Sequence, residues 1–168
     1  PQGRAVIAVS EGFLFRGGVE RELRRHLLEH GQVEAVVGLP AGSFAPYTSV
    51  KGALLLLRRK GGADRVRLVD AAPLFDARSD GKGQRKAPVI RSEVAHQLAL
   101  DLMRPELRRP VKGVEDATPD RGLISRFLWE VPVSELASAD WDLTPRRRER
   151  GGLLDVLAGL QEALGQQA

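Results

Sequence analysis

The sequence predicts an α/β fold in which a sheet ends in an antiparallel hairpin and a helical C-terminal extension follows. Three observations predict it. Two apolar runs of strand length, residues 5–9 and 33–39, flank a segment with helical spacing. A third apolar run, residues 50–57, follows the second too closely for a helical crossover and predicts an antiparallel partner. Leucines at helical spacing between Gly152 and Leu164 predict a terminal amphipathic helix.

The first strand, residues 5–9, is continuously apolar, which is typical of a strand buried on both faces. A glycine-bounded loop, residues 12–18, separates it from a helix over residues 19–28. His30-Gly31 ends this helix, because glycine favours the left-handed backbone of a helix C-terminus. Strand, helix and strand in this order predict a right-handed parallel crossover to residues 33–39.

The fourth strand, residues 65–69, alternates charged and apolar residues, and so predicts an edge strand with one wet face. Residues 76–86 are polar and charged, and predict a mobile loop. A helix is expected over residues 89–103, and a short strand within residues 123–133 with a helix starting at Ser134. We therefore divide the chain into residues 1–75, the α/β part, and residues 76–168, a loop plus helical extension for DNA or subunit contact.

Composition excludes several classes of protein. The chain of 168 residues has no cysteine, so disulfides and thiolate metal sites are excluded. Its three histidines, His26, His30 and His96, form no ligand pattern with nearby carboxylates, and we expect no metal site. No apolar run approaches the roughly 20 residues that span a bilayer, and no signal region is visible. We expect a cytoplasmic protein without a membrane partner.

Positive charge is concentrated in two segments, residues 78–91 and 146–150, although the net charge of the chain is only +4. Such clusters suit a polyanion, because neutralised phosphates release counterions. The alternative is a solvated loop and a charge run beside a helix, and composition does not separate the two. The candidate DNA-binding residues are Lys82, Arg85, Lys86, Arg146, Arg147 and Arg148.

An ordered set of segments resembles one known family. In chain order, these segments are residues 3–9, Gly12-Phe13-Leu14-Phe15-Arg16-Gly17-Gly18, residues 20–24, residues 33–40, Ser43-Phe44, residues 54–60, Val131-Pro132-Val133 and Asp140-Trp141-Asp142-Leu143-Thr144-Pro145-Arg146. Together they resemble modification subunits of type I restriction-modification systems. The resemblance covers most of the chain and is weakest over residues 72–122. It implies the C-terminal half of a Rossmann-like methyltransferase sheet, within an adenine-N6 DNA methyltransferase.

The resemblance also implies a cofactor and partners. The cofactor would be S-adenosyl-L-methionine, and the partners double-stranded DNA, a specificity subunit and, further, a restriction subunit. The family's glycine-rich cofactor loop and its Asn-Pro-Pro-aromatic motif are both missing, and Ala72-Pro73-Leu74-Phe75 lacks the amide and one proline. We therefore expect the catalytic and cofactor motifs upstream, no catalytic residue in this chain, and no activity of the fragment alone.

Four residues are candidates for a target-base pocket. In related adenine methyltransferases an aromatic ring stacks on the extruded base, and Phe44 is the match, with Tyr47 as a substitute. Gly12 and Phe15 follow a strand end, where α/β sheets place ligands. The alternatives are that Phe44 anchors its own loop and that Phe13 and Phe15 pack on a helix. Trp141 is expected to serve packing.

Two other functions compete with the methyltransferase part. One is a non-catalytic DNA-binding or assembly module with the same fold half. For either function, the leucine face of residues 152–164 has two alternatives: it covers the sheet, or it docks on a partner helix. The other, a nicotinamide-dependent oxidoreductase, is disfavoured because no GxGxxG motif follows a strand. Half of a sheet also exposes an edge, through which we expect a homodimer to be able to form.

Overall fold

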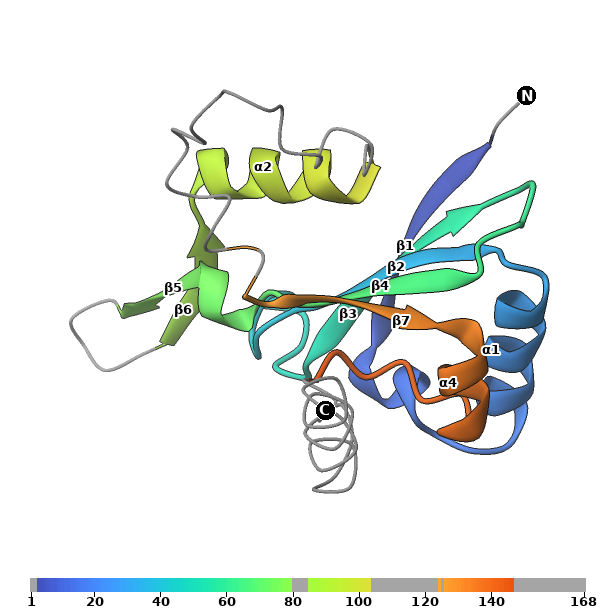
Figure 1. Cartoon of the computed structure of the whole chain (residues 1–168). Helices are drawn as coiled ribbons and strands as arrows, with labels where there is room; N and C mark the ends of the chain where they lie inside the picture. Colours follow the sequence, from blue (N-terminus) through green and yellow to red (C-terminus); the bar gives the residue numbers. More distant parts are fainter. Residues whose placement is uncertain (1–2, 80–84, 104–123, 125, 147–168) are drawn as a thin grey trace, which may run out of the picture.

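Five strands form one mixed sheet, around which the described helices pack (Figure 1). The computed structural model describes residues 3–79, 85–103, 124 and 126–146, and the statements below concern those residues. In spatial order, the strands are β1 (Arg4–Ser10), β3 (Gly52–Arg58), β2 (Val33–Gly38), β4 (Arg65–Asp70) and β7 (Leu128–Pro132).

Strand β3 lies between β1 and β2 and is antiparallel to both, so β1 and β2 run in the same direction. This confirms the antiparallel β2–β3 pair and the parallel relation of β1 and β2. Strand β4 is parallel to β2, and β7 is antiparallel to β4. The carboxyl ends of β1, β2 and β4 therefore share one end of the sheet.

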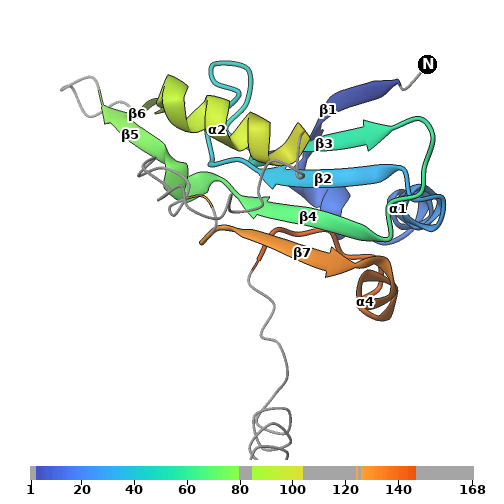
Figure 2. The same ribbon diagram turned by 45° about the horizontal axis from the view of Figure 1, so that its top comes forward.

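Helices cover both faces of the sheet, as Figures 1 and 2 show. Helix α2 (Ser92–Met103) buries Val94, Leu98 and Leu102 in a cluster with residues of β2 and β4. Helices α1 (Val19–Glu29) and α4 (Val133–Ser138) lie on the other face. There, the second cluster contains Leu14, Leu28, Val33, Val36, Ala53, Leu55, Val66, Leu68, Val131, Leu136 and Leu143.

A separate two-stranded ribbon includes residues 76–79 and 85–86, which were expected to belong to a mobile loop, whereas residues 80–84 of that expected loop lie outside the described residues (Figure 2). It consists of β5 (Phe75–Ser79) and β6 (Arg85–Ile90), in antiparallel register. The prediction was wrong because apolar residues lie at the base of the ribbon: Phe75 pairs with Ile90, and both pack against the α2 cluster. A short 3-10 helix, η2 (Ala72–Leu74), joins β4 to β5.

Two strands exchange the environments expected for them. Strand β1, expected to be buried on both faces, is an edge strand of this sheet, with Val6 60% exposed and Ile7 also exposed. Strand β4, expected at an edge, is interior and almost fully buried. Its Arg67 is only 8% exposed, because the guanidinium donates to the carbonyls of Glu34 (3.4 Å) and Asp101 (3.2 Å).

The helices expected over residues 19–28 and 89–103 and the strand near residue 130 are confirmed, although α2 begins only at Ser92 and only part of the apolar face of α1 is buried. Leu27 packs against the core cluster that contains Leu28. Arg24 and Leu28 are the buried residues of α1, whereas Val19 and Leu23 are exposed. The helix expected over residues 152–164 lies outside the described residues. Among those described, no helix is long and apolar enough to cross a membrane.

Candidate functional site

The loops with predicted functional residues lie at the carboxyl end of the parallel strands. The 3-10 helix η1 (Glu11–Leu14) follows β1 directly, and the loop with Phe44 joins β2 to β3. The ribbon β5–β6 lies at this end as well. Its Pro88 packs near Gly42 of the β2–β3 loop, where an ideal Cβ on Gly42 would lie 3.7 Å from Pro88 Cδ. Open α/β sheets bind ligands at this end, where loops from neighbouring strands converge.

A hollow of about 370 Å³ lies beside Phe44 at this end of the sheet. Its volume is at the lower end of the range for ligand pockets, roughly 300 to 1,000 Å³. Phe44 was predicted from the sequence, but the polar residues beside it were not, since single serine, threonine and lysine residues form no motif. The lining residues are Ala8, Val9, Ser10, Phe44, Thr48, Val50, Lys51 and Gly52.

The half-buried ring of Phe44 lies directly against Gly52, the first residue of β3. An ideal Cβ on Gly52 would collide with Phe44 Cε2 and would also approach the Val9 carbonyl oxygen to 3.0 Å. The ring therefore occupies space that only a glycine leaves free. Phe44 both packs on its own sheet and lines the hollow, so the two expectations for this residue are compatible.

The other three pocket candidates are not among the residues that line this hollow. Tyr47 is 93% exposed, and Phe15 is exposed as well. Gly12 lies against the guanidinium of Arg16, with an ideal Cβ 2.8 Å from Arg16 Nε, and its carbonyl accepts from the amide of Arg16 (2.9 Å). Gly12 thus shapes the turn after β1.

The hollow also has a cationic residue at its rim. The side chain of Lys51 is about half exposed, and its Nζ lies 4.0 Å from Glu11 Oε1. An exposed pair at this distance is weak and screened by salt. The ammonium group can therefore exchange Glu11 for another anion, such as a phosphate.

The candidate DNA-binding residues are only partly within the described residues. Arg85 and Lys86 lie on β6, where the register places Lys86 opposite Arg78 and Arg85 opposite Ser79. Arg146 is exposed and its Nη2 lies 2.7 Å from Asp142 Oδ2. Lys82, Arg147 and Arg148 lie outside the described residues.

Residues 140–146, which we call the closing segment, reach the same end of the sheet. The amide of Leu143 donates to the carbonyl of Leu14 in η1 (2.9 Å), and the side chain of Leu143 is buried. Pro145 packs at the end of β2, where an ideal Cβ on Gly38 would lie 3.2 Å from Pro145 Cγ. Trp141 packs against the hydrophobic cluster on the face of the sheet that α1 and α4 cover, as expected.

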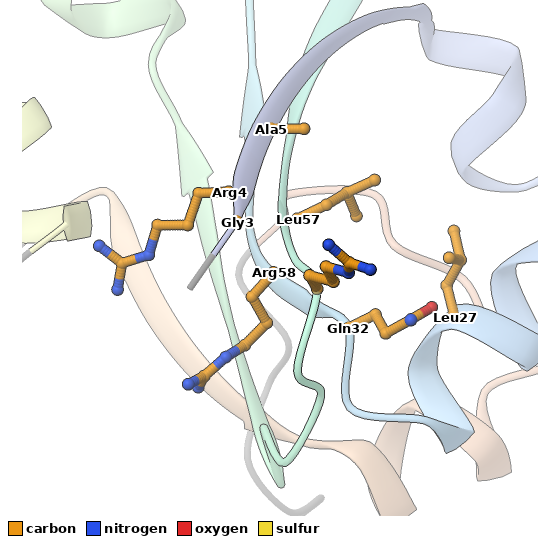
Figure 3. Close-up of a pocket in the computed structure, with 8 residues that line it drawn as sticks. Gly3, Arg4, Ala5, Leu27, Gln32, Leu57 and Arg58 are labelled. Atoms are coloured by element: carbon orange, nitrogen blue, oxygen red, sulfur yellow. The ribbon is translucent and has the colours of Figure 1, made fainter. Parts of the chain in front are cut away.

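A second hollow, of about 340 Å³, lies near the opposite end of β1 (Figure 3). Ala5, Leu27 and Leu57 give it an apolar wall. The side chains of Arg4 on β1 and Arg58 on β3 extend away from this wall. They pair with buried Glu34, with Arg4 Nε 3.2 Å from Glu34 Oε2 and Arg58 Nε 3.6 Å from Glu34 Oε1. No group of three or more His, Cys, Asp or Glu residues that could hold a metal occurs in the part of the chain that the structure describes.

Comparison with known proteins gives a consistent result. The family model described as N-6 DNA Methylase matches residues 1–150. Over 58 residues, 34% of this chain, the sequence is 34% identical to the type I restriction enzyme EcoEI methylase subunit of Escherichia coli. That match covers 12% of the E. coli protein.

Solved structures show the same fold. A chain from a structure of a type I R-M system is 29% identical, with a TM-score of 0.62, over 98% of this chain and 33% of that one. The type I restriction-modification methyltransferase subunit from Streptococcus thermophilus is 24% identical, with a TM-score of 0.62, over 85% of this chain and 26% of that one. The chain thus spans about a third of the length of the first of these solved relatives and about a quarter of the second.

The family model covers the five-stranded sheet, both hollows, the ribbon and the closing segment. The methylase likeness therefore extends across the whole described structure rather than one motif. This chain belongs to the N-6 DNA methylase family.

Proposed function

We propose that the complete protein containing this chain is a site-specific adenine-N6 DNA methyltransferase of a type I restriction-modification system. The observation that carries this proposal is the family match over residues 1–150. The E. coli relative, a methylase subunit of a type I restriction enzyme, supports the same system. In this proposal the five-stranded sheet is the C-terminal half of a Rossmann-like methyltransferase sheet, and the residues beyond it form a helical extension.

The methyl donor of this enzyme would be S-adenosyl-L-methionine, but the described residues do not fit it. The hollow beside Phe44 has no carboxylate among its lining residues to accept from the ribose hydroxyls. The hollow at β1 likewise has no carboxylate among its lining residues. We therefore place the cofactor site and the catalytic motifs in another part of the complete protein, and assign no methyl-transfer step to this chain.

The hollow beside Phe44 is proposed to receive the extruded adenine. Extrusion costs a few kcal/mol of lost stacking, and an aromatic ring in the pocket offsets part of it. Phe44 is held in place by its contact with Gly52, which leaves little freedom to lose when a base binds. Tyr47, Gly12 and Phe15 would contribute to the mouth of the pocket once DNA is bound.

The DNA backbone is proposed to lie along the same end of the sheet. Arg146 is exposed there, and the closing segment is fixed to η1 and to the end of β2. Arg85 and Lys86 on the ribbon, with Lys82, Arg147 and Arg148, would add phosphate contacts. A specificity subunit would choose the DNA sequence, and a restriction subunit would complete the system.

The test is methylation by the complete protein, co-expressed with its specificity subunit in a host that lacks adenine methylation. Single-molecule sequencing of the host genome should show N6-methyladenine at one recurring sequence. Variant Phe44→Ala should lower kcat/KM at that sequence about tenfold or more, since stacking on one base is worth about 1–3 kcal/mol. Phe44→Tyr keeps the ring and should retain most activity.

Two controls separate the alternatives. Tyr47→Ala removes an almost fully exposed ring at the mouth of the pocket and should lower kcat/KM far less than Phe44→Ala does; a loss as large as that of Phe44→Ala would make Tyr47 the stacking residue. DNA binding with no methylated adenine in the genome would contradict the enzyme, and would support a non-catalytic DNA-binding module.

A further inference from the structure

Arg24 of α1 is a fully buried arginine on a helix whose other arginines are accessible. Its exposure is 0%, whereas Arg21 and Arg25 form ion pairs at the surface of α1. Burial of a guanidinium is costly unless its donors find acceptors. Desolvation lowers the pKa of Arg24, and the nearby carboxylates of Asp142 and Asp140 act in the opposite direction. Such an arrangement calls for a specific role.

The donors of Arg24 join two segments that are distant in sequence. Its Nε donates to the carbonyl of Trp141 in the closing segment, at 2.8 Å. Its Nη1 donates to the carbonyls of Phe13 (2.8 Å) and Arg16 (2.7 Å), in and just after η1. One planar group thus links the turn after β1 to the closing segment. Its Nη2 has no hydrogen-bond partner among the described residues.

The closing segment depends on such contacts for its conformation. Asp140 and Trp141 have positive φ angles, 55° and 61°, which non-glycine residues adopt rarely and only where surrounding contacts hold them. Arg24 binds the carbonyl of Trp141 itself, and Arg21 Nε lies 2.5 Å from Asp140 Oδ1. Five residues after Trp141, the exposed Arg146 begins the basic cluster.

We propose that Arg24 is a positioning residue that fixes the closing segment to the turn after β1, so that Arg146 reaches the DNA backbone. This rests on the proposed DNA-binding function. Arg24 is remote from solvent and touches no DNA itself. Its effect on DNA passes through the backbone carbonyl of Trp141 and the anchored Leu143.

The test compares Arg24→Met with Arg25→Met in the complete protein. Arg25 is also an α1 arginine, but its contacts are exposed ion pairs with Glu22 and Glu29. The first readout is binding of a fluorescein-labelled random duplex of about 30 base pairs over a range of salt concentrations. The slope of log K against log[salt] counts phosphate contacts, at about 0.9 per contact. The second is hydrogen exchange at the Leu143 amide.

We expect Arg24→Met to reduce the slope by about 1, which corresponds to the loss of the phosphate contact by Arg146. Exchange at Leu143 should rise at least tenfold, while exchange in α2 stays unchanged. A general loss of stability would instead lower the fraction of folded protein without changing the slope. Arg25→Met should match the wild type in both readouts.

A wild-type slope together with wild-type exchange at Leu143 in Arg24→Met would overturn the proposal. If Arg24→Met does not fold, Arg24→Lys decides by the same readouts, because lysine keeps the charge but lacks the planar fork that reaches both segments. Failure of the wild-type protein to bind the duplex would contradict the DNA-binding function instead. Exchange at Leu143 would then still decide whether Arg24 holds the closing segment.

Discussion

Phe44 and Gly52 act as one structural unit. The ring of Phe44 lies where a side chain at position 52 would be, so its orientation beside the hollow depends on the missing Cβ. Phe44 was found from the sequence because an aromatic residue in this loop resembles a family feature. Gly52 was not found, since a glycine at the start of a strand carries no sign of the ring that it accommodates.

Gly52→Ala should destabilise the protein by about 1–3 kcal/mol, because the added methyl group overlaps the Phe44 ring and approaches the Val9 carbonyl. Urea denaturation would measure the change as a lower midpoint. Gly17→Ala is the matched control, since an ideal Cβ there has nothing within 4 Å. Equal midpoints for the two variants would show that the ring can move away without cost.

Helix α1 carries an exposed network of charges at the scale of the element. Glu22 pairs with Arg25 (2.9 Å) and Arg21 (2.6 Å), and Arg25 also pairs with Glu29 (3.1 Å). The hydrogen bond from Arg25, and then that from Arg21, lower the pKa of the Glu22 carboxyl below its usual 4.5. The charged form is therefore favoured in the folded protein.

The contribution of Glu22 to stability depends on pH in one direction. A lowered pKa stabilises the fold fully above the usual value of 4.5, and this contribution is lost as the pH falls below it towards the lowered pKa. Glu22→Gln should thus lower the melting temperature slightly at pH 7 and by less at pH 3, with less effect in high salt. A difference that persists at pH 3 would point to packing instead.

Element types were more predictable than element environments. The β2–β3 pair, α1, α2 and β7 followed from apolar spacing and connection length. The runs in β1 and β2 look alike in sequence, yet one is exposed and the other buried, because exposure depends on neighbours that a local pattern does not encode. Arg67 misled for a related reason: backbone carbonyls of Glu34 and Asp101, distant in sequence, accept from it inside the fold.

The outer edge of β1 is the most exposed apolar part of the sheet. Val6 and Ile7 are exposed, and the outer backbone groups of β1 have no partner strand among the described residues. An apolar edge of this kind is a template for pairing with another strand. In the complete protein, we propose that another strand of the methyltransferase sheet occupies it.

The isolated chain should self-associate through this edge, and Val6→Lys should reduce the association at least several-fold, because an edge lysine opposes strand pairing. Sedimentation velocity over a range of concentrations would measure it. Val19→Lys is the control, since Val19 is exposed on α1 and not on the sheet. A monomeric wild-type chain, or an equal effect of both variants, would contradict pairing through β1.

The position of β3 between β1 and β2 has a consequence for the order of folding. Strand β1 does not pair with β2; β3 lies between them and comes later in the chain than both. Pairing of Gly38 with Ala53 closes a short loop, whereas pairing of Arg4 with Arg58 closes a much longer one. On a ribosome, β1 must therefore wait, unpaired on this side, until residue 58 has emerged and the β2–β3 hairpin has formed a template for it.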